Sequence, residues 1–308
     1  MDPRKIAVLG TGGTVAGTAS TPRDHVGYRS AQIGIDQLLA AIPALRGVPL
    51  ATEQVAQVDS KDMSFEVWRD LALRCDHWLN DDSVAGVVVT HGTDTLEETA
   101  YFLQEVLQPA KPVVITCAMR PATALMPDGP QNIVDAVATA LAPGARGVVA
   151  VCAGTIHAAA DVTKVHTYRL DAFTSGDAGP VGYVEEGRVR LVRDWPRPAG
   201  GGLLPKVRAV SAWPRVEIIT SHAGASGSLV QALVAQGVQG IVVAGTGNGT
   251  VHREVEAALL EAAAAGVQVV RSTRCVAGHV IAHPFDRLRA HPASPVKARI
   301  ALMLELLA

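Results

Sequence analysis

Short aliphatic runs that alternate with helix-length segments constrain the fold of this chain more than any other feature. The strands that we predict are Lys5–Leu9, Val84–Thr90, Val113–Thr116, Val148–Val151, Val216–Thr220, Ile241–Ala244 and Val267–Arg271. Several of them are apolar throughout, as is typical of strands covered on both faces. The predicted helices between and after them are Ile35–Ala41, Phe65–Leu79, Leu96–Leu107, Ile133–Leu141, Gly227–Ala235, Val251–Ala264 and Pro295–Leu307. This alternation predicts an α/β fold with a mostly parallel sheet flanked by helices.

The alternation breaks between the fourth and the fifth strand. Val181–Val192 reads as an antiparallel hairpin that turns at Glu186-Gly187, and the stretch RDWPRPAGGGLLP follows it. Proline and glycine exclude helix and central strand there. We therefore expect a larger N-terminal α/β catalytic domain (1–191), a Pro/Gly-rich linker (192–213) and a smaller C-terminal α/β domain (214–308).

Composition excludes several classes of protein. Hydrophobic residues make up 48 % of the chain and charged residues 18 %, which excludes disorder and leaves apolar material for a subunit interface. A net charge of −2 and 4 % aromatic residues argue against a nucleic-acid partner. No apolar run approaches the ~20 residues of a membrane span. Because MDPRKIAVLG lacks the pattern of a signal peptide, we expect a cytoplasmic protein without a membrane partner.

Cysteine and histidine spacing gives no metal-binding pattern. Cys75, Cys117, Cys152 and Cys275 lie far apart and are expected to be buried thiols. The i,i+4 pair His279 and His283 precedes Pro284 and has no evident third ligand, so no metal site is expected.

In open α/β sheets, ligands bind beyond the carboxyl ends of the strands, so the loops there are the candidate sites. The first is Gly10-Thr11-Gly12-Gly13-Thr14-Val15-Ala16-Gly17. A dinucleotide fingerprint would need glycine at Val15, and a P-loop would end in Gly-Lys-Ser/Thr. The loop is therefore either a tight turn in which Thr14 caps a helix or a ligand loop that presents a hydroxyl group.

Two further loops leave the same choice open. Thr93 and Asp94 follow the strand Val84–Thr90; they are either N-caps or a hydroxyl beside a carboxylate, as acyl transfer would need. The segment Val58–Met63 precedes the helix Phe65–Leu79. Either Ser64 or Asp62 is simply the N-cap of that helix, or a hydroxyl group and exposed amides at its start receive a substrate carboxylate.

The last two loops carry a lysine and a glycine-rich turn. Lys164 is either a solvated surface charge or a base held near Asp94 in a dry cleft. Gly245–Thr250 comes closest to a dinucleotide loop, but Thr250 occupies the third glycine position and no acidic residue ends the next strand. Nucleotide binding is therefore not expected.

Taken together, these loops resemble those of the bacterial L-asparaginase family, which includes the glutaminase-asparaginases. The resemblance covers most of the chain and rests on TGGTVAG, DSKDM, THGTDTLEETAYFL, KPVVITCAMRP, DGPQNI, DVTK and GTGNG, in family order and at family-like spacing. It implies hydrolysis of the side-chain amide of asparagine to aspartate and ammonia, with no metal or cofactor.

The resemblance also implies roles for individual residues. Thr14 matches the primary nucleophile, and Tyr28, in an irregular segment that we expect to close over the substrate, matches its hydroxyl partner. Thr93, Asp94 and Lys164 match a second catalytic group. A threonine hydroxyl needs a base in reach, and backbone N–H groups of the two Gly-Thr loops would stabilise the oxyanion.

Substrate-binding positions follow from the same resemblance. The α-carboxylate, the α-amino group and the amide would be held by Asp59, Ser60, Lys61, Asp94 and the backbone of Ala118, and a neighbouring subunit would add Asn248. Lys61 stands where many members have glutamine, and Thr250 where asparagine is common. The segment Val276–His291 carries no glutamate. We therefore expect weak glutaminase activity.

The family assembles as dimers of dimers, so a homotetramer with sites at the dimer interface is implied. The main alternative is a non-catalytic protein that binds or senses an amino acid on the same fold. A subunit of a tRNA-dependent amidotransferase would want a further N-terminal domain and a basic surface, and neither is evident.

Overall fold

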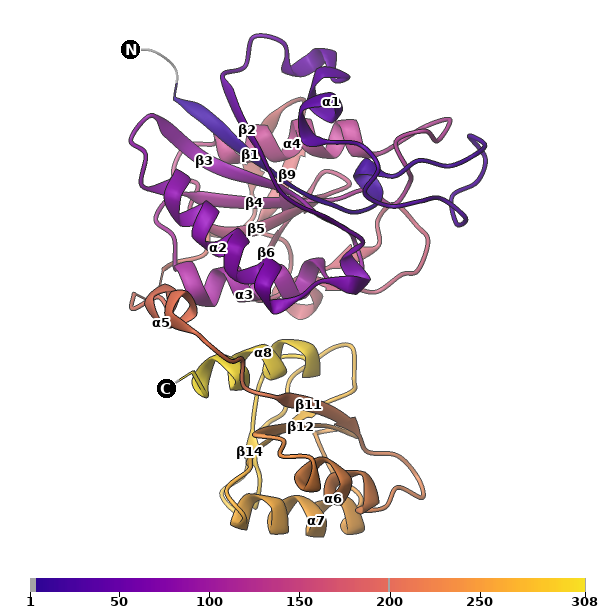
Figure 1. Cartoon of the computed structure of the whole chain (residues 1–308), viewed down its shortest axis with the longest axis vertical. Coiled ribbons are helices and arrows are strands. Elements are labelled where there is room, and N and C mark those ends of the chain that lie inside the picture. Colours follow the sequence, from indigo (N-terminus) through magenta and orange to yellow (C-terminus); the bar gives the residue numbers. More distant parts are fainter. Residues whose placement is uncertain (1–3, 199, 308) are drawn as a thin grey trace. The chain divides into compact units, whose positions relative to one another are not determined.

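The computed structural model of the chain describes residues 4–198 and 200–307. It forms two compact units, Met1–Leu204 and Pro205–Ala308, each built around its own sheet (Figure 1). None of the described helices combines the length and the apolar character that crossing a membrane requires.

An eight-stranded sheet forms the centre of the first unit, in the order β10-β9-β6-β5-β4-β3-β1-β2. The five strands from β2 to β5 in this order are parallel, and β6, β9 and β10 extend the sheet antiparallel. The strands are β1 (Lys5–Gly12), β2 (Leu50–Val58), β3 (Val84–Thr90), β4 (Pro112–Thr116), β5 (Gly147–Cys152), β6 (Thr155–Ala158), β9 (Gly182–Glu185) and β10 (Arg188–Leu191). A separate short ribbon pairs β7 (Thr163–Lys164) with β8 (Phe173–Thr174).

Helices cover both faces of this sheet, which explains why its central strands are apolar throughout. One face packs on α1 (Ile35–Ala40) and α4 (Gly129–Ala140), and the other on α2 (Phe65–Leu79) and α3 (Leu96–Leu107) (Figure 1). Short 3₁₀ turns are η1 (Thr14–Ala16), η2 (Pro43–Leu45), η3 (Ser60–Asp62) and η4 (Gly176–Ala178). The β4 residues are all buried, so the central strands support the loops at the carboxyl edge of the sheet.

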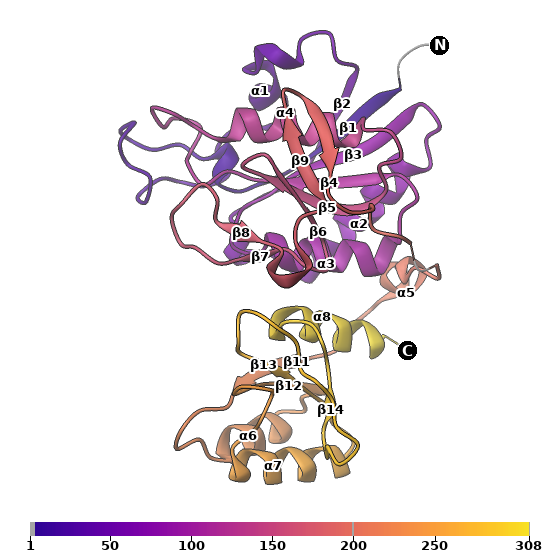
Figure 2. The same ribbon diagram turned by 180° about the vertical axis from the view of Figure 1, so that it is seen from behind.

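The second unit has a parallel sheet of β11 (Val216–Thr220), β12 (Gly240–Gly245), β13 (Gln268–Thr273) and β14 (Arg289–Ala290). Helices α6 (Ser228–Ala235) and α7 (Arg253–Ala264) cover one face, and α8 (Pro295–Glu305) lies on the other (Figure 2). The boundary between the units falls within α5 (Leu204–Ala209).

All seven predicted strands are present, and the hairpin is confirmed. Its turn residues Glu186 and Gly187 have φ of +49° and +70°, as the tight turn of a two-residue hairpin requires. Four predictions about local structure were wrong. The edge strand β2 was not predicted because its residues are only partly buried. Helix α4 begins at Gly129, four residues before the predicted start, and α5 begins within the last residues of the stretch RDWPRPAGGGLLP.

The fourth error concerns a thiol. Cys75, Cys117 and Cys152 are buried as expected, but Cys275 is exposed because it follows β13, where the chain leaves the sheet. Burial raises the pKa of the Cys75 thiol. Cys117 directly follows β4, and Cys152 ends the neighbouring β5, with their sulfur atoms 3.2 Å apart. That contact together with burial raises the pKa of the Cys117 thiol.

Candidate active site

Two glycine loops touch at the carboxyl edge of the large sheet. One follows β1 and the other follows β3, and a Cβ atom on Gly13 would lie 2.4 Å from both Cα and N of Gly92. Only glycine permits this approach, and Gly13 has in addition a φ of +78°. Thr14 and Thr93, which follow these glycines directly, are therefore held on adjoining backbones, and both are buried.

The Thr14 hydroxyl meets that of Tyr28. Thr14 Oγ1 and Tyr28 Oη lie 2.6 Å apart, a normal distance between two hydroxyl groups in a hydrogen bond. Tyr28 belongs to the segment 18–30, whose ends are joined by hydrogen bonds in both directions between the backbones of Thr18 and Arg29. The segment thus lies closed over Thr14.

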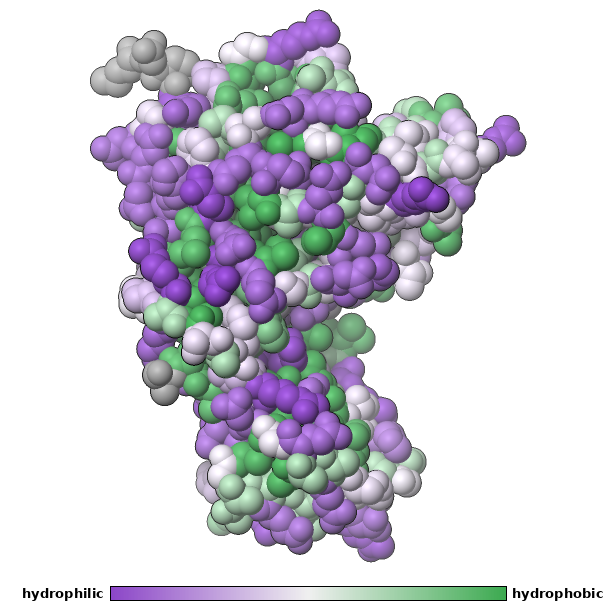
Figure 3. All heavy atoms as spheres, in the orientation of Figure 1, coloured by the Kyte–Doolittle hydropathy of each residue, from purple (hydrophilic) through white to green (hydrophobic). Residues whose placement is uncertain are grey.

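Contacts with the segment after β4 hold 18–30 in this position. The Leu125 N–H donates to Pro22 O at 3.1 Å, and the Ala19 N–H donates to Thr123 Oγ1 at 2.8 Å. Aliphatic side chains reach the surface of the lobe that these two segments form (Figure 3), among them Val26 at 80 % and Leu125 at 75 % exposure. Exposed aliphatic side chains therefore lie among the polar ones on this lobe.

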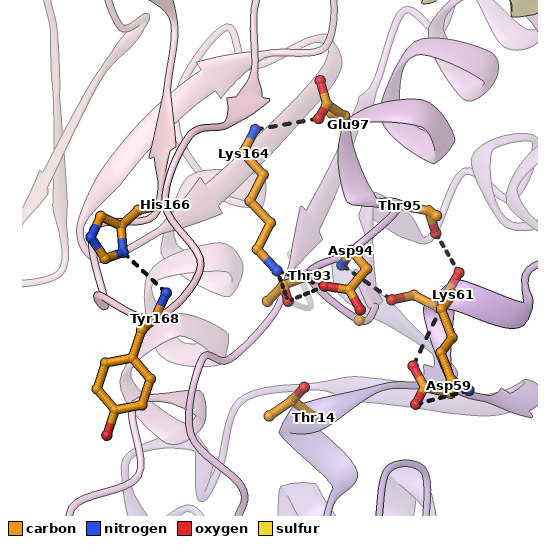
Figure 4. A network of polar contacts seen from close by, with 12 residues as sticks. Thr14, Asp59, Lys61, Thr93, Asp94, Thr95, Glu97, Lys164, His166 and Tyr168 are labelled. Atoms are coloured by element: carbon orange, nitrogen blue, oxygen red, sulfur yellow. Dashed lines mark hydrogen bonds and ion pairs between the residues drawn. The ribbon is translucent and has the colours of Figure 1, made fainter. Parts of the chain in front are cut away.

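The Thr93 hydroxyl meets an amine and a carboxylate (Figure 4). Lys164 Nζ, from β7, donates to Thr93 Oγ1 at 2.8 Å and to Asp94 Oδ1 at 2.6 Å. The Lys164 side chain is 18 % exposed and that of Asp94 is 54 % exposed. The Lys164 ammonium is thus held between the buried Thr93 hydroxyl and the exposed Asp94 carboxylate. The second carboxylate oxygen of Asp94 is available to a further hydrogen-bond donor.

The DSKDM segment reaches the same place through η3. Ser60 Oγ accepts a hydrogen bond from the Asp94 N–H at 3.2 Å, and Ser60 O accepts one from the Thr95 hydroxyl at 2.8 Å. Asp59 caps η3, and Lys61 Nζ lies 3.5 Å from its carboxylate. The hydrogen bond to Asp62 raises the pKa of the Lys61 ammonium.

Ala118 lies in the loop after β4, and two residues without a predicted role hold that loop. The N–H groups of Met119 and Arg120 each donate to the Asp128 carboxylate at 2.9 Å. The Asn132 amide donates to Cys117 O at 2.9 Å. Asp128 and Asn132 both belong to the DGPQNI motif. The sequence shows the motif, but it does not show that these two residues hold the loop after β4 in place.

Asn248 belongs to the second unit, in the loop between β12 and α7. Its side-chain amide pairs in both directions with the backbone of Ile281, at 2.9 Å to the carbonyl oxygen and 2.8 Å from the N–H. Within its own unit, Asn248 holds the loop after β13 in place.

The first unit brings together the other predicted side chains of the site: Thr14, Tyr28, Thr93, Asp94, Lys164, Asp59, Ser60 and Lys61.

No group of three or more metal-ligating side chains occurs among residues 4–198 and 200–307. The site presents two threonine hydroxyls, one hydrogen-bonded to a tyrosine hydroxyl and the other to a lysine ammonium, on adjoining backbone loops. Such a set suits attack on a carbonyl carbon.

Comparison with known proteins agrees with this chemistry. The sequence model of the asparaginase N-terminal domain matches residues 5–197, and that of the glutaminase/asparaginase C-terminal domain matches residues 215–308. The chain belongs to the asparaginase family of amidohydrolases.

Individual relatives are similar over nearly the whole chain. L-asparaginase 2 of Escherichia coli (strain K12) is 37 % identical over 98 % of this chain and 88 % of its own length. A glutaminase-asparaginase of Pseudomonas fluorescens biotype A is 36 % identical over 98 % and 86 %. Among solved structures, a probable cytoplasmic L-asparaginase from Campylobacter jejuni matches with a TM-score of 0.91 and 38 % identity, covering 98 % of this chain and 94 % of its own.

Proposed function

We propose that this chain hydrolyses the side-chain amide of L-asparagine to L-aspartate and ammonia through an acyl-enzyme on Thr14. One observation carries the proposal: two threonine hydroxyls lie on touching loops, and each has its own proton-transfer partner, Tyr28 at 2.6 Å and Lys164 at 2.8 Å. A protein that only binds an amino acid has no need of either pair.

In the first half-reaction, Thr14 Oγ1 attacks the amide carbon. Its proton passes to Tyr28 Oη, and the tyrosine hydroxyl passes its own proton to the amide nitrogen, so that ammonia leaves and an ester forms. In the second half, water attacks the ester carbon, and its proton passes by way of the Thr93 hydroxyl, held by Lys164, to Thr14 Oγ1. Cleavage of the ester returns the Thr14 hydroxyl and gives aspartate.

Backbone N–H groups supply the oxyanion site in this proposal. The N–H groups of Thr14 and Thr93 have no acceptor among the described residues and lie on adjoining loops. A donor of this kind contributes roughly 10²–10³ in kcat when the site excludes water. The closed segment 18–30 would provide that exclusion.

The remaining groups would bind the rest of the substrate. The open Asp94 carboxylate suits the α-ammonium group, while Ser60 and Asp59 at η3, with Lys61 beside them, suit the α-carboxylate end. The backbone of Ala118 would contact the amide. The weak glutaminase activity expected above stays part of the proposal.

We extend the proposal to assembly and location. The chain would form a homotetramer, a dimer of dimers, in which Asn248 of a neighbouring subunit borders each site and the segment 192–213 links the two domains. The exposed aliphatic side chains Val26, Leu125 and Met126 beside the site support such an interface. The similarity to the probable cytoplasmic L-asparaginase from Campylobacter jejuni supports a cytoplasmic location. Light scattering on the purified chain would measure the assembly.

Ammonia release from L-Asn, L-Gln and D-Asn, measured side by side, tests the proposed activity. L-Asn is expected to be the best substrate, and Thr14→Ala is expected to abolish turnover while the protein stays folded. Binding of L-aspartate without ammonia release from any substrate would instead establish the non-catalytic alternative.

A further inference from the structure

A fully buried histidine precedes the second glycine loop. His91 follows β3 directly, and its imidazole lies between two polar contacts, Nδ1 to Gly92 O at 2.7 Å and Nε2 to Thr99 Oγ1 at 2.9 Å. The same Thr99 oxygen accepts a hydrogen bond from Trp68 Nε1 at 2.8 Å. A chain of hydrogen bonds thus runs from α2 through α3 to the loop that carries Thr93.

The donor at one end of this series of hydrogen bonds and the acceptor at the other end determine which way every hydrogen bond in it points. The Trp68 indole N–H only donates, and the Gly92 carbonyl only accepts. Nδ1 of His91 must therefore carry a hydrogen, and Thr99, which accepts from Trp68, is left to donate its own hydrogen to Nε2. Burial lowers the pKa of His91 to about 4, so the ring is neutral at physiological pH and Nε2 is an acceptor.

This direction determines where the Thr93 N–H points. The Gly92 carbonyl and the Thr93 N–H belong to one peptide group, which is trans, so they point in opposite directions. With the carbonyl held on the buried imidazole, the Thr93 N–H points to the side of the loop opposite His91. A peptide group after glycine rotates easily unless a contact fixes it.

We propose that His91 is a positioning residue that locks the Gly92–Thr93 peptide, so that the Thr93 N–H stays aimed at the substrate oxyanion, and that Trp68 and Thr99 hold its ring in the required Nδ1–H form. This inference rests on the proposed function, because it assigns the Thr93 N–H to that reaction. His91 itself touches no reacting atom.

Two substitutions with the same functional group but different reach separate the roles of the two ring nitrogens. In His91→Asn the amide nitrogen takes the place of Nδ1 and still donates to Gly92 O; in His91→Gln the amide reaches the place of Nε2 instead. We expect His91→Gln to lower kcat for L-Asn by roughly 10²-fold, as for the loss of one oxyanion donor. His91→Asn should retain kcat to within about tenfold, and KM should change less than about threefold in both.

Leu103→Ala is the control for general destabilisation, because it opens a cavity in the same helix as Thr99 and removes none of the hydrogen bonds in this chain. It should lower the melting temperature without lowering kcat. Equal losses of kcat in His91→Asn and His91→Gln, or an equal loss in Leu103→Ala, would refute the positioning role.

Nitrogen-15 NMR of the unmodified protein tests the ring directly and does not depend on activity. The His91 resonances, assigned by their absence in His91→Asn or His91→Gln, should report a neutral ring with hydrogen on Nδ1 from pH 5.5 to 8. An Nε2–H tautomer, or titration near 6.5, would overturn the inference even if the enzyme is active. Absence of ammonia release from the unmodified protein, with the Nδ1–H form observed, would overturn the oxyanion assignment and the proposed function together but leave the hydrogen-bond chain intact.

Discussion

Replacing Lys164 by methionine separates catalysis from stability more clearly than any other substitution in the site. Methionine keeps most of the length of the side chain but cannot donate, so both hydrogen bonds of the ammonium are lost. On one side of the lysine is the buried Thr93 hydroxyl, and on the other is the open Asp94 carboxylate. These two environments determine what the substitution costs.

The stability cost is small. Because Asp94 is more than half exposed, water replaces the ammonium there, and such an ion pair contributes about 0–1 kcal/mol. The hydrogen bond to Thr93 contributes about 1 kcal/mol more. For a protein of this size, a total of about 1–2 kcal/mol lowers the melting temperature by less than about 8 °C.

The kinetic cost is larger. If Lys164 moves the proton of Thr93 in the reaction, its loss removes a factor of roughly 10²–10⁴ from kcat. This corresponds to about 3–5 kcal/mol in the activation barrier. The enzyme would remain folded at 25 °C and be almost inactive.

The assay is ammonia release from L-Asn by the purified variant, with its melting curve recorded by circular dichroism. Lys111→Met is the matched control, because Lys111 Nζ also donates a part-buried hydrogen bond, at 2.8 Å to Asp81 O, but at the opposite edge of the sheet. A kcat within about threefold of wild type, or an equal loss in Lys111→Met, would refute the role of Lys164.

Three further predictions follow from the same geometry. Tyr28→Phe removes the hydroxyl 2.6 Å from Thr14 and should lower kcat by roughly 10²-fold; unchanged turnover would remove Tyr28 from the reaction. Mass spectrometry after quenching with a slow substrate should find an acyl adduct on Thr14, whereas an adduct on Thr93 alone would exchange the roles of the two threonines. Burial lowers the pKa of His157 to about 4, below its usual 6.5, so the unfolded chain takes up a proton first as the pH falls. The free energy of unfolding should therefore be highest above pH 6.5 and fall by about 3 kcal/mol towards pH 4, and urea titrations at pH 7 and 5 should show a smaller difference for His157→Gln.

The central layer of the fold could be predicted from the sequence because burial on both faces leaves an apolar signature. Val84–Thr90 and Phe65–Leu79 agree with the structure at both ends. At the edge of the sheet this signature is absent: Leu50–Val58 is partly exposed and contains Thr52, Glu53 and Gln54. Helix α4 begins early because Pro130 suits a first helical turn, a signal that the apolar pattern does not contain.

The sequence could predict that the site residues lie together, because their loops follow the carboxyl ends of strands. It could not predict which side chains contact one another. The contact of Lys164 with Thr93 joins positions 71 residues apart, and no local pattern records it. Threonine and aspartate serve both as helix caps and as catalytic residues, so the sequence alone does not decide the role of Thr93 and Asp94. The contact of both with Lys164 favours a catalytic role. Ser64 turned out to be the cap of α2, through its hydrogen bond from Val67 N, which leaves Ser60 available for the site.

The exposed Cys275 makes the chain easy to label. Since the other three thiols are buried, a maleimide dye should attach at one position per chain without unfolding it. The sulfur lies 3.7 Å from Gly247 O, beside Asn248, so the dye would sit next to the loop that we place against a neighbouring subunit. Energy transfer between donor- and acceptor-labelled chains would then follow subunit exchange in real time.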